Sequence, residues 1–394
     1  MPTPTLTQRL HLSDIAPTVV QSEIRAMSVE CDRIGGINLA QVICDTDLPP
    51  LVAQAAIEAI AAGQNIYTRL DGISPLRQAI AEKFASFNGL TVDPDTQVLV
   101  TSGATGALYT SLLALLNPGD EVIVFEPFYG YHVSTLLSLR MVPVIVPLAE
   151  PDWQLDTEAL RAAITPRTRA LIVNTPSNPC GKVFSRAELE AVAELAIEHD
   201  LFVFTDEIYE YFLFDGETHI SMATLPGMAE RTITISGLSK TFSVTGWRIG
   251  YLATDPRWIP AIGYFHDLIY ICAPAPLQHG VAAGLRGLAA TSFYTDIARD
   301  YQAKRDELCG ALTAAGLTPC IPAGAYYVLA DASRISGTLA RDKARNLLAA
   351  TGVAAVAGSA FFRQGRGENL LRFCFGKKPA DLTRACEQLR ASPY

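Results

Sequence analysis

Residues 239–250 read Ser-Lys-Thr-Phe-Ser-Val-Thr-Gly-Trp-Arg-Ile-Gly and carry the most informative pattern in this chain. They place the amine of Lys240 among small and hydroxyl side chains, with Arg248 following on the same stretch. A lysine amine attacks a carbonyl only when neutral, so its surroundings must lower its ordinary pKa of about 10.4. The permanently charged arginine fork suits a phosphate. Together the two side chains predict a ligand with an aldehyde and a phosphate, which describes pyridoxal phosphate.

Short apolar segments alternate with helical patterns on both sides of this run. The predicted strands cover residues 98–101, 122–125, 142–146, 170–174, 201–205, 232–236 and 249–253. Most of these segments are apolar throughout, as expected of strands covered on both faces. A predicted helix over 188–199 starts with the capping pair Ser185 and Glu188. The alternation predicts an α/β fold, with a mostly parallel seven-stranded sheet in an α/β/α sandwich.

The two ends of the chain follow a different pattern. Residues 297–314 read as a helix, and short strands are predicted around 325–330 and 370–375. A length of 394 residues exceeds what one hydrophobic core usually serves. We therefore predict a large domain and a small α+β domain built from both chain ends. The predicted bounds are 49–290 for the large domain, and 1–48 with 291–394 for the small one.

The composition narrows the class of protein. Hydrophobic residues make up 49% and charged residues 18% of the chain, which suits a large folded core. The formal net charge of -9 disfavours nucleic acid and anionic membranes as partners, because both attract basic surfaces. The eight cysteines are scattered, without a CxxC pair or metal-ligand spacing. No secretory pattern opens the chain, so we expect a cytoplasmic protein with reduced thiols, no metal and no membrane span.

Further polar groups lie at the ends of predicted elements. Gly103, Ala104 and Thr105 occupy a turn between a strand and a helix, where backbone N–H groups attract anions. A plain strand-to-helix connection is the alternative. Asp206 ends an apolar strand, and ligands of open α/β sheets bind at such carboxyl ends, although Asp206 could instead cap the next helix. Arg372 interrupts an apolar strand, so its charge needs a ligand carboxylate or a structural ion pair.

Together these stretches resemble the class I/II aminotransferases, the fold-type-I pyridoxal phosphate enzymes of the aspartate aminotransferase superfamily. The similarity covers most of the chain, from about Ile15 to the C-terminus. It implies that Lys240 forms a Schiff base with the cofactor aldehyde and later moves a proton, and that Asp206 keeps the ring nitrogen protonated. The implied phosphate ligands are Gly103, Ala104, Thr105, Arg248 and Ser236 or Ser239.

The resemblance assigns roles to five more residues. It implies that Tyr129, in Pro-Phe-Tyr-Gly-Tyr, stacks on the pyridine ring. It implies that Asn178 and Tyr209 bond to the phenolic oxygen of the cofactor, and that Arg372 holds the substrate's α-carboxylate. Tyr67 matches a tyrosine that reaches the cofactor phosphate of the other subunit. A homodimer with shared active sites is therefore expected.

Two positions depart from the family pattern and bear on the substrate. The resemblance implies that Gln41 and Val42 contact the substrate, together with Arg372 and Asn178. Val42 stands where relatives usually have a glycine, so we expect an altered substrate pose. Thr105 stands where bacterial aspartate aminotransferases of this subgroup commonly have a lysine for the distal carboxylate. We therefore expect weak activity on aspartate. His266 is expected either to shape the pocket from the partner subunit or to be a packed helix residue.

The resemblance implies an aminotransferase that moves an amino group between an L-amino acid and a 2-oxo acid with ping-pong kinetics. The expected donor is neutral, apolar or aromatic. The same cofactor residues serve other chemistry, so a β-lyase, an ACC-synthase-like elimination and an amino-acid oxidase stay open. A ligand-sensing regulator is a third class. Regulators of this kind usually carry an extra DNA-binding domain, which we do not expect in this acidic chain.

Overall fold

The central sheet contains all seven strands predicted from the sequence. The computed structural model describes residues 12–18, 23–41, 44–392 and 394. In spatial order the strands run β2, β8, β7, β6, β5, β3 and β4. Their bounds are β2 Val98–Ser102, β3 Glu121–Glu126, β4 Val142–Pro147, β5 Thr168–Asn174, β6 Phe202–Asp206, β7 Thr232–Gly237 and β8 Ile249–Ala253. The predicted α/β class is confirmed.

Strand direction gathers the polar strand ends at one rim of the sheet. Strands β3 to β7 pair in parallel, whereas β8 lies antiparallel to both β2 and β7. Asn174 at the end of β5 pairs with Asp206 at the end of β6, which in turn pairs with Ile235 of β7. Parallel strands end at the same edge, so this rim is where a ligand of an open α/β sheet is expected.

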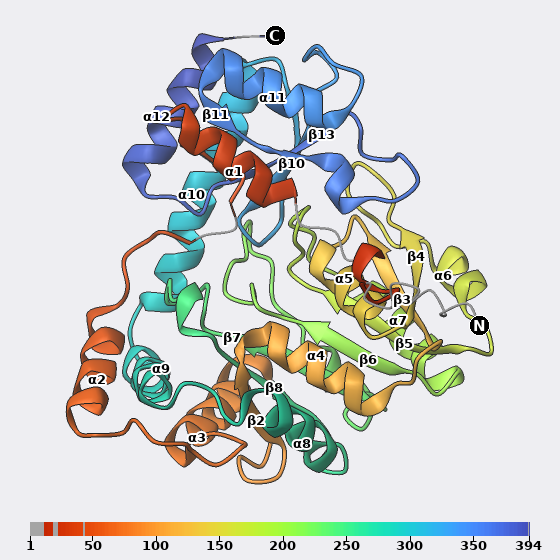
Figure 1. Ribbon diagram of the computed structural model, residues 1–394, viewed down its shortest axis with the longest axis vertical. Coiled ribbons are helices and arrows are strands. Elements are labelled where there is room, and N and C mark those ends of the chain that lie inside the picture. Colours follow the sequence, from red (N-terminus) through yellow and green to blue (C-terminus); the bar gives the residue numbers. More distant parts are fainter. Residues whose placement is uncertain (1–11, 19–22, 42–43, 393) are drawn as a thin grey trace, which may run out of the picture.

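Helices surround the sheet (Figure 1). Helix α7 starts with the predicted capping box, in which Ser185 and Glu188 bond to each other's backbone N–H groups. The α-helices are α1 Glu23–Arg33, α2 Pro50–Ala61, α3 Ser74–Lys83, α4 Gly103–Leu115, α5 Gly130–Ser138, α6 Thr157–Ala163, α7 Arg186–Glu198, α8 Ile259–Tyr270, α9 Ala275–Leu288, α10 Phe293–Ala314, α11 Ala340–Thr351 and α12 Pro379–Ala391. Short 3-10 or π helices are η1 Ala16–Thr18, η2 Phe84–Asn88, η3 Met222–Thr224, η4 Thr245–Trp247 and η5 Gly358–Phe361.

The C-terminal residues form a second sheet to which the N-terminal part is joined. Its antiparallel strands, in spatial order, are β12 Val356–Ala357, β13 Leu370–Cys374, β10 Tyr327–Asp331 and β9 Thr318–Cys320. Beside it, β1 (Ile37–Asn38) pairs in parallel with β11 (Val353–Ala354). Figure 1 shows α1 next to these C-terminal elements. The domain limits after residues 48 and 290 stay a prediction.

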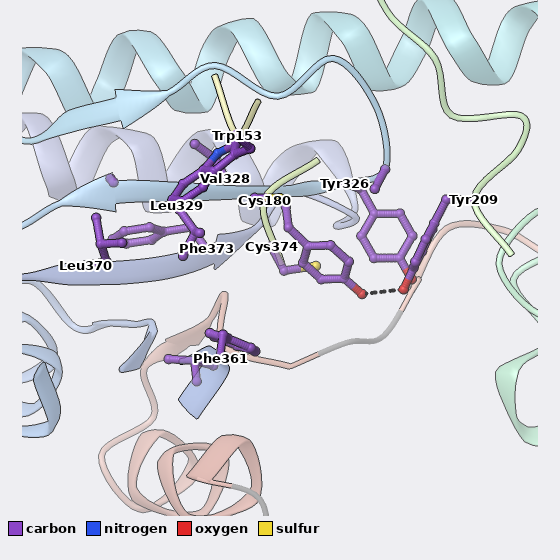
Figure 2. Close-up of a cluster of buried hydrophobic side chains, with 14 of the residues drawn as sticks. Trp153, Cys180, Tyr209, Tyr326, Val328, Leu329, Phe361, Leu370, Phe373 and Cys374 are labelled. Carbon is purple, nitrogen blue, oxygen red and sulfur yellow. Dashed lines mark hydrogen bonds between the residues drawn. The ribbon is translucent and has the colours of Figure 1, made fainter. Parts of the chain in front are cut away.

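One hydrophobic core continues from the central sheet into the C-terminal sheet. It joins Leu171 and Val203 of the central sheet to Leu329 and Phe373 of the C-terminal one. Figure 2 shows part of this core, including Leu329, Phe373 and Cys374. The shared core holds strand β13 against the central sheet. Among the described helices, none is both long and apolar enough to cross a membrane.

A buried histidine ties α8 to the end of β2. The backbone N–H of Ser102 donates to Nε2 of His266 at 3.0 Å, so this nitrogen carries no proton. Burial lowers the pKa of His266 to about 4 from its ordinary value of 6.5. His266 therefore packs inside its own chain, beside the turn at Gly103, and the packed helix position is the alternative that holds.

His266 makes the stability of the protein depend on pH in one direction. Between pH 6.5 and about 4 the unfolded chain binds a proton at His266 that the folded chain excludes. As the pH falls from 6.5 to about 4, the free energy of unfolding should decrease by up to about 3 kcal/mol because of this group. Urea unfolding at several pH values measures the slope. His266→Gln, which keeps an acceptor but does not titrate, should flatten it.

The exposed His199 provides the control for this measurement, because its side chain is 36% accessible. His199→Gln should keep the wild-type slope. Equal slopes for His266→Gln and the wild type would contradict the assignment.

Candidate active site

A cavity of about 140 Å³ opens at the rim where β5, β6 and β7 end. Separate stretches of the chain meet there, as expected for a site at the carboxyl ends of parallel strands. The predicted residues that line the cavity are Ala104, Thr105, Tyr129, Asn178, Asp206, Tyr209, Ser239, Lys240 and Arg248. The fold therefore brings most of the predicted site into one place.

Lys240 reaches the cavity from the turn that follows β7. Burial lowers the pKa of its amine from 10.5 to about 8, and the positive charge of Arg248 acts in the same direction. Nearby thiols and Asp206 oppose the shift, but burial dominates. At pH 7 roughly a tenth of such amines are neutral, against less than about a thousandth at the ordinary value. The pocket therefore gives Lys240 the property that a nucleophilic amine needs.

Arg248 closes over the turn at Gly103. Gly103 has a φ of +72°, and a Cβ there would lie 2.2 Å from the guanidinium Nη2 of Arg248. A Cβ at Gly250 would lie 2.3 Å from the backbone carbon of Gly103. Two glycines thus let an arginine and the start of α4 approach the same point. Backbone N–H groups, a helix N-terminus and a guanidinium there form a site suited to a phosphate.

His132 is a cavity residue that the sequence analysis missed. Its Nε2 lies 2.9 Å from Oδ2 of Asp206, and the carboxylate only accepts, so the histidine donates. The ring also stands edge-on to Tyr129, with centroids 5.3 Å apart. Tyr129 is the N-cap residue of α5 and His132 follows it by three positions, in the first turn of the helix, which brings the two rings together. That spacing was the available signal.

Asn174 is a second residue that was missed, and it braces the loop that carries Asn178. Its side-chain N–H donates to the backbone oxygen of Asp206 at 2.9 Å, and its oxygen accepts from the Asn178 N–H at 2.8 Å. Asn174 also lines the cavity. Its position at the carboxyl end of β5 could have indicated this role.

Tyr209 joins the cavity to the hydrophobic core. Its hydroxyl lies 2.9 Å from that of Tyr327, and its ring stands edge-on to Tyr326 with centroids 5.1 Å apart. Figure 2 shows Tyr209 and Tyr326 side by side. Burial raises the pKa of Tyr209, so it stays a neutral phenol. A neutral phenol can donate a hydrogen bond into the cavity.

Arg372 lies fully buried behind Asn178. Its guanidinium donates to Oδ1 of Asn178 at 3.0 Å and to the backbone oxygen of Ala40 at 2.7 Å. The rings of Tyr327 and Phe361 lie 4.6 and 4.8 Å from its central carbon. Within the described residues Arg372 forms no ion pair, and its Nε has no hydrogen-bond partner. The structural ion pair considered from the sequence is therefore not seen.

Besides Gly103 and Arg372, which lie next to the cavity without lining it, four predicted residues lie away from the cavity or outside the described part of the chain. Ser236 is corrected, because its hydroxyl donates to Glu210 at 2.8 Å. Neighbouring residues of a strand face opposite sides, and Ile235 takes the cavity side. Tyr67 is 76% exposed, and Gln41 is half-buried, so neither lines the cavity in this chain. Val42 lies outside the described residues.

Comparison with known proteins places this chain in a family. The model for aminotransferase class I and II matches residues 34–389. A probable N-succinyldiaminopimelate aminotransferase of Mycobacterium tuberculosis is 38% identical, with 94% of this chain and 95% of that protein covered. A kynurenine–oxoglutarate transaminase of Dictyostelium discoideum is 34% identical, with 91% of each covered.

A solved structure supports the same conclusion. YbdL of Escherichia coli, for which a methionine aminotransferase function was identified, superposes with a TM-score of 0.93 at 31% identity. The superposition covers 97% of this chain and 100% of that one. Each of these relatives is named as an aminotransferase or transaminase. The chain therefore belongs to the aminotransferase class I and II family, whose members use pyridoxal phosphate, and it is an aminotransferase of fold type I.

Proposed function

We propose that this chain binds pyridoxal phosphate in the cavity at Lys240 and transfers amino groups from neutral, apolar or aromatic L-amino acids to 2-oxo acids. The lowered pKa of the buried Lys240 amine is the observation that carries the proposal. When bound, the cofactor supplies an electron sink for the charge that develops on the substrate's α-carbon.

The donor set of the cavity fits this cofactor. The turn at Gly103, Ala104 and Thr105 together with Arg248 and Ser239 suits its phosphate. Tyr129 offers a flat wall for a planar ring. In this proposal Asp206 holds a proton on the ring nitrogen, and His132 keeps that carboxylate oriented from behind. Asn178 and Tyr209 donate to the phenolic oxygen.

Two residues handle the substrate in this proposal. With the cofactor bound, Lys240 would take the proton from the α-carbon, for which an amine with a pKa of about 8 is suited near neutral pH. Arg372 binds the α-carboxylate. A buried guanidinium with no ion pair among the described residues supports that role, because a substrate anion would balance its charge.

The surroundings of the cavity support a neutral donor. A second cavity of about 230 Å³ shares Tyr129 and Tyr131 with the first. Apolar and aromatic side chains dominate its lining, with Glu23 and Arg363 also present. Thr105 leaves no cation on the turn where a distal carboxylate would be read. Among the relatives, kynurenine and methionine are donors of this neutral kind, whereas N-succinyldiaminopimelate carries further carboxylates.

An exposed apolar patch supports a homodimer with shared sites. Ile66 is 79%, Tyr67 76% and Leu268 69% exposed, although all three are apolar or aromatic. Leu70 packs against Gly263 of α8, which makes the loop and the helix one continuous surface. Apolar patches of this kind mark interaction sites. A second copy would cover the patch and bring Tyr67 to the partner's phosphate site. A cytoplasmic location, with no membrane or nucleic-acid partner, completes the proposal.

Lys240 should control both the colour and the pH dependence of the protein. Apoprotein mixed with pyridoxal phosphate should gain its visible absorbance at a rate that rises with pH and is half-maximal near pH 8, because only the neutral amine reacts. Stopped-flow absorbance measures this rate. Lys240→Ala should lose the band and at least about a thousandfold in kcat. The exposed Lys378→Ala is the control, and full activity in Lys240→Ala would refute the proposal.

Thr105 should disfavour aspartate as a donor. We expect kcat/KM for aspartate below roughly a tenth of that for methionine or phenylalanine, because the Thr105 side chain offers no positive charge to the distal carboxylate. Thr105→Lys should raise the aspartate value about tenfold. Thr224→Lys, an exposed threonine outside the cavity, is the control. An aspartate ratio well above unity in the wild type would contradict this assignment.

Leu268→Asp should convert a dimer into monomers and remove most activity, because a buried charge in an apolar interface is costly. Sedimentation velocity measures the mass. Leu339→Asp, at an exposed apolar residue of the C-terminal part, should remain dimeric. Refolding Tyr67→Ala together with Lys240→Ala should restore up to roughly a quarter of wild-type activity through mixed dimers with one intact site. No recovery would exclude shared sites.

A further inference from the structure

A buried group of polar side chains lies behind the turn that carries Asp206 and Tyr209. We call it the Glu210 cluster. It gathers residues from α3, η2, the turn after β6, residues 219–221, β7 and β8. Its members are Lys83, Asn88, Glu207, Glu210, His219, Ser221, Ser236 and Tyr251. Their side chains are almost completely shielded from solvent.

Lys83 is the lysine of this cluster and pairs with Glu210. Its Nζ donates to Oε2 of Glu210 at 2.5 Å, and the two side chains are 5% and 2% exposed. The same Nζ lies 4.8 Å from the ring centre of Phe84 and 5.8 Å from that of Tyr251. Burial lowers the pKa of Lys83, and the charge of Glu210 opposes that shift. The ammonium is thus held by a carboxylate and aromatic faces.

Glu210 extends this ion pair to two strands of the sheet. Its Oε1 accepts from the hydroxyl of Ser236 on β7 at 2.8 Å and lies 3.5 Å from that of Tyr251 on β8. Its Oε2 accepts from the amide of Asn88 at 3.0 Å. Burial raises the pKa of Glu210, but the charge of Lys83 acts together with His219 and the hydrogen bonds from Lys83 and Asn88 to lower it overall. Glu210 therefore stays ionised beside Lys83.

Glu207 anchors the other side of the cluster. Its Oε2 accepts from Nε2 of His219 at 2.7 Å and from the hydroxyl of Ser221 at 2.6 Å. Its backbone N–H donates to the Ile235 oxygen of β7 at 2.8 Å. Glu207, Glu210 and His219 offer ligand atoms within 4.8 Å of one another, as a cation site does. The Lys83 ammonium supplies the cation of this group.

The chain alternates between the cavity and the cluster at the turn after β6. Asp206 and Tyr209 line the cavity, whereas Glu207 and Glu210 belong to the cluster. The two residues that would touch the cofactor therefore each precede a glutamate that is held by hydrogen bonds or an ion pair in the Glu210 cluster. A shift of either glutamate would move the backbone of its catalytic neighbour.

We propose that Lys83 is a positioning residue for catalysis, which holds the turn at 206–210 through Glu210 and balances the negative charge beneath the cofactor site. The inference rests on the proposed function, since it concerns groups around the cofactor. Removing one partner of a buried ion pair leaves an uncompensated charge, whereas removing both leaves none. The titratable groups around Lys83 are Glu207, Glu210, His219, Tyr211 and Tyr251.

Four variants of the full-length holoenzyme test this role. Lys83→Met keeps an unbranched side chain that is one atom shorter and removes the charge, and Lys83→Arg keeps the charge. Lys83→Met combined with Glu210→Gln removes both charges, while the amide introduced by the second substitution can still form hydrogen bonds. Glu82→Gln is the matched control, because Glu82 precedes Lys83 on α3 and its ion pair with Arg286 is exposed. The readouts are the pH midpoint of the cofactor absorbance, kcat and KM separately, and the melting temperature.

Lys83→Met should raise the midpoint by roughly half a unit or more, because an unbalanced negative charge favours the protonated cofactor site. It should also lower kcat about tenfold with little change in KM, as expected from misplacement rather than lost binding. Lys83→Arg should keep the wild-type midpoint. The double variant should return the midpoint to the wild-type value.

Several outcomes would overturn the proposal. A folded Lys83→Met with unchanged midpoint and kcat and only a lower melting temperature would make Lys83 purely structural. Should Lys83→Met fail to fold, the proposal is overturned by a displaced midpoint in either the folded double variant or Lys83→Arg. A wild-type protein without any cofactor absorbance would instead refute the proposed function, so the two failures are distinguishable.

Discussion

Exclusion of water from one amine is the constraint on which the active site depends. Burial is the largest cause of the lowered pKa of Lys240, and the proposed role of its amine as a nucleophile rests on that loss of hydration. Low solvent exposure also strengthens the interaction between Asp206 and His132. It makes the buried charge of Arg372 energetically costly unless an anion balances it. The direction of the strands, the shared hydrophobic core and the glycines at the turn therefore all help to bury the charged groups of the cavity.

Along the backbone that forms the site, some side chains point into the cavity and others point away from it. On the turn after β6, Asp206 and Tyr209 face the cavity while Glu207 and Glu210 face a buried polar cluster. Strand β7 repeats this arrangement with Ile235 and Ser236. A loop at the rim of a sheet would otherwise be among the more mobile parts of a protein. Hydrogen bonds behind it supply the rigidity that precise placement of catalytic groups requires.

The sequence predicted the strands well because strands covered on both faces are apolar throughout and are bounded by clear turn residues. It also predicted most cavity residues, since local motifs carry them. It failed where a residue's role depended on which face of a strand its side chain occupies, or on a partner far away along the chain. Ser236 was assigned to the wrong face of β7. Lys83 gave no signal, because its partner Glu210 lies 127 positions away along the chain.

Two buried cations in this chain differ in whether a carboxylate of the protein neutralises them. Lys83 is neutralised by Glu210 inside the protein, so no ligand is needed to compensate it. Arg372 is equally buried, yet its described partners are an amide oxygen, a backbone oxygen and two aromatic rings, all of them uncharged. A buried charge of this second kind is tolerated when a bound anion completes it. The difference between the two environments is the physical reason to assign Lys83 to positioning and Arg372 to the substrate carboxylate.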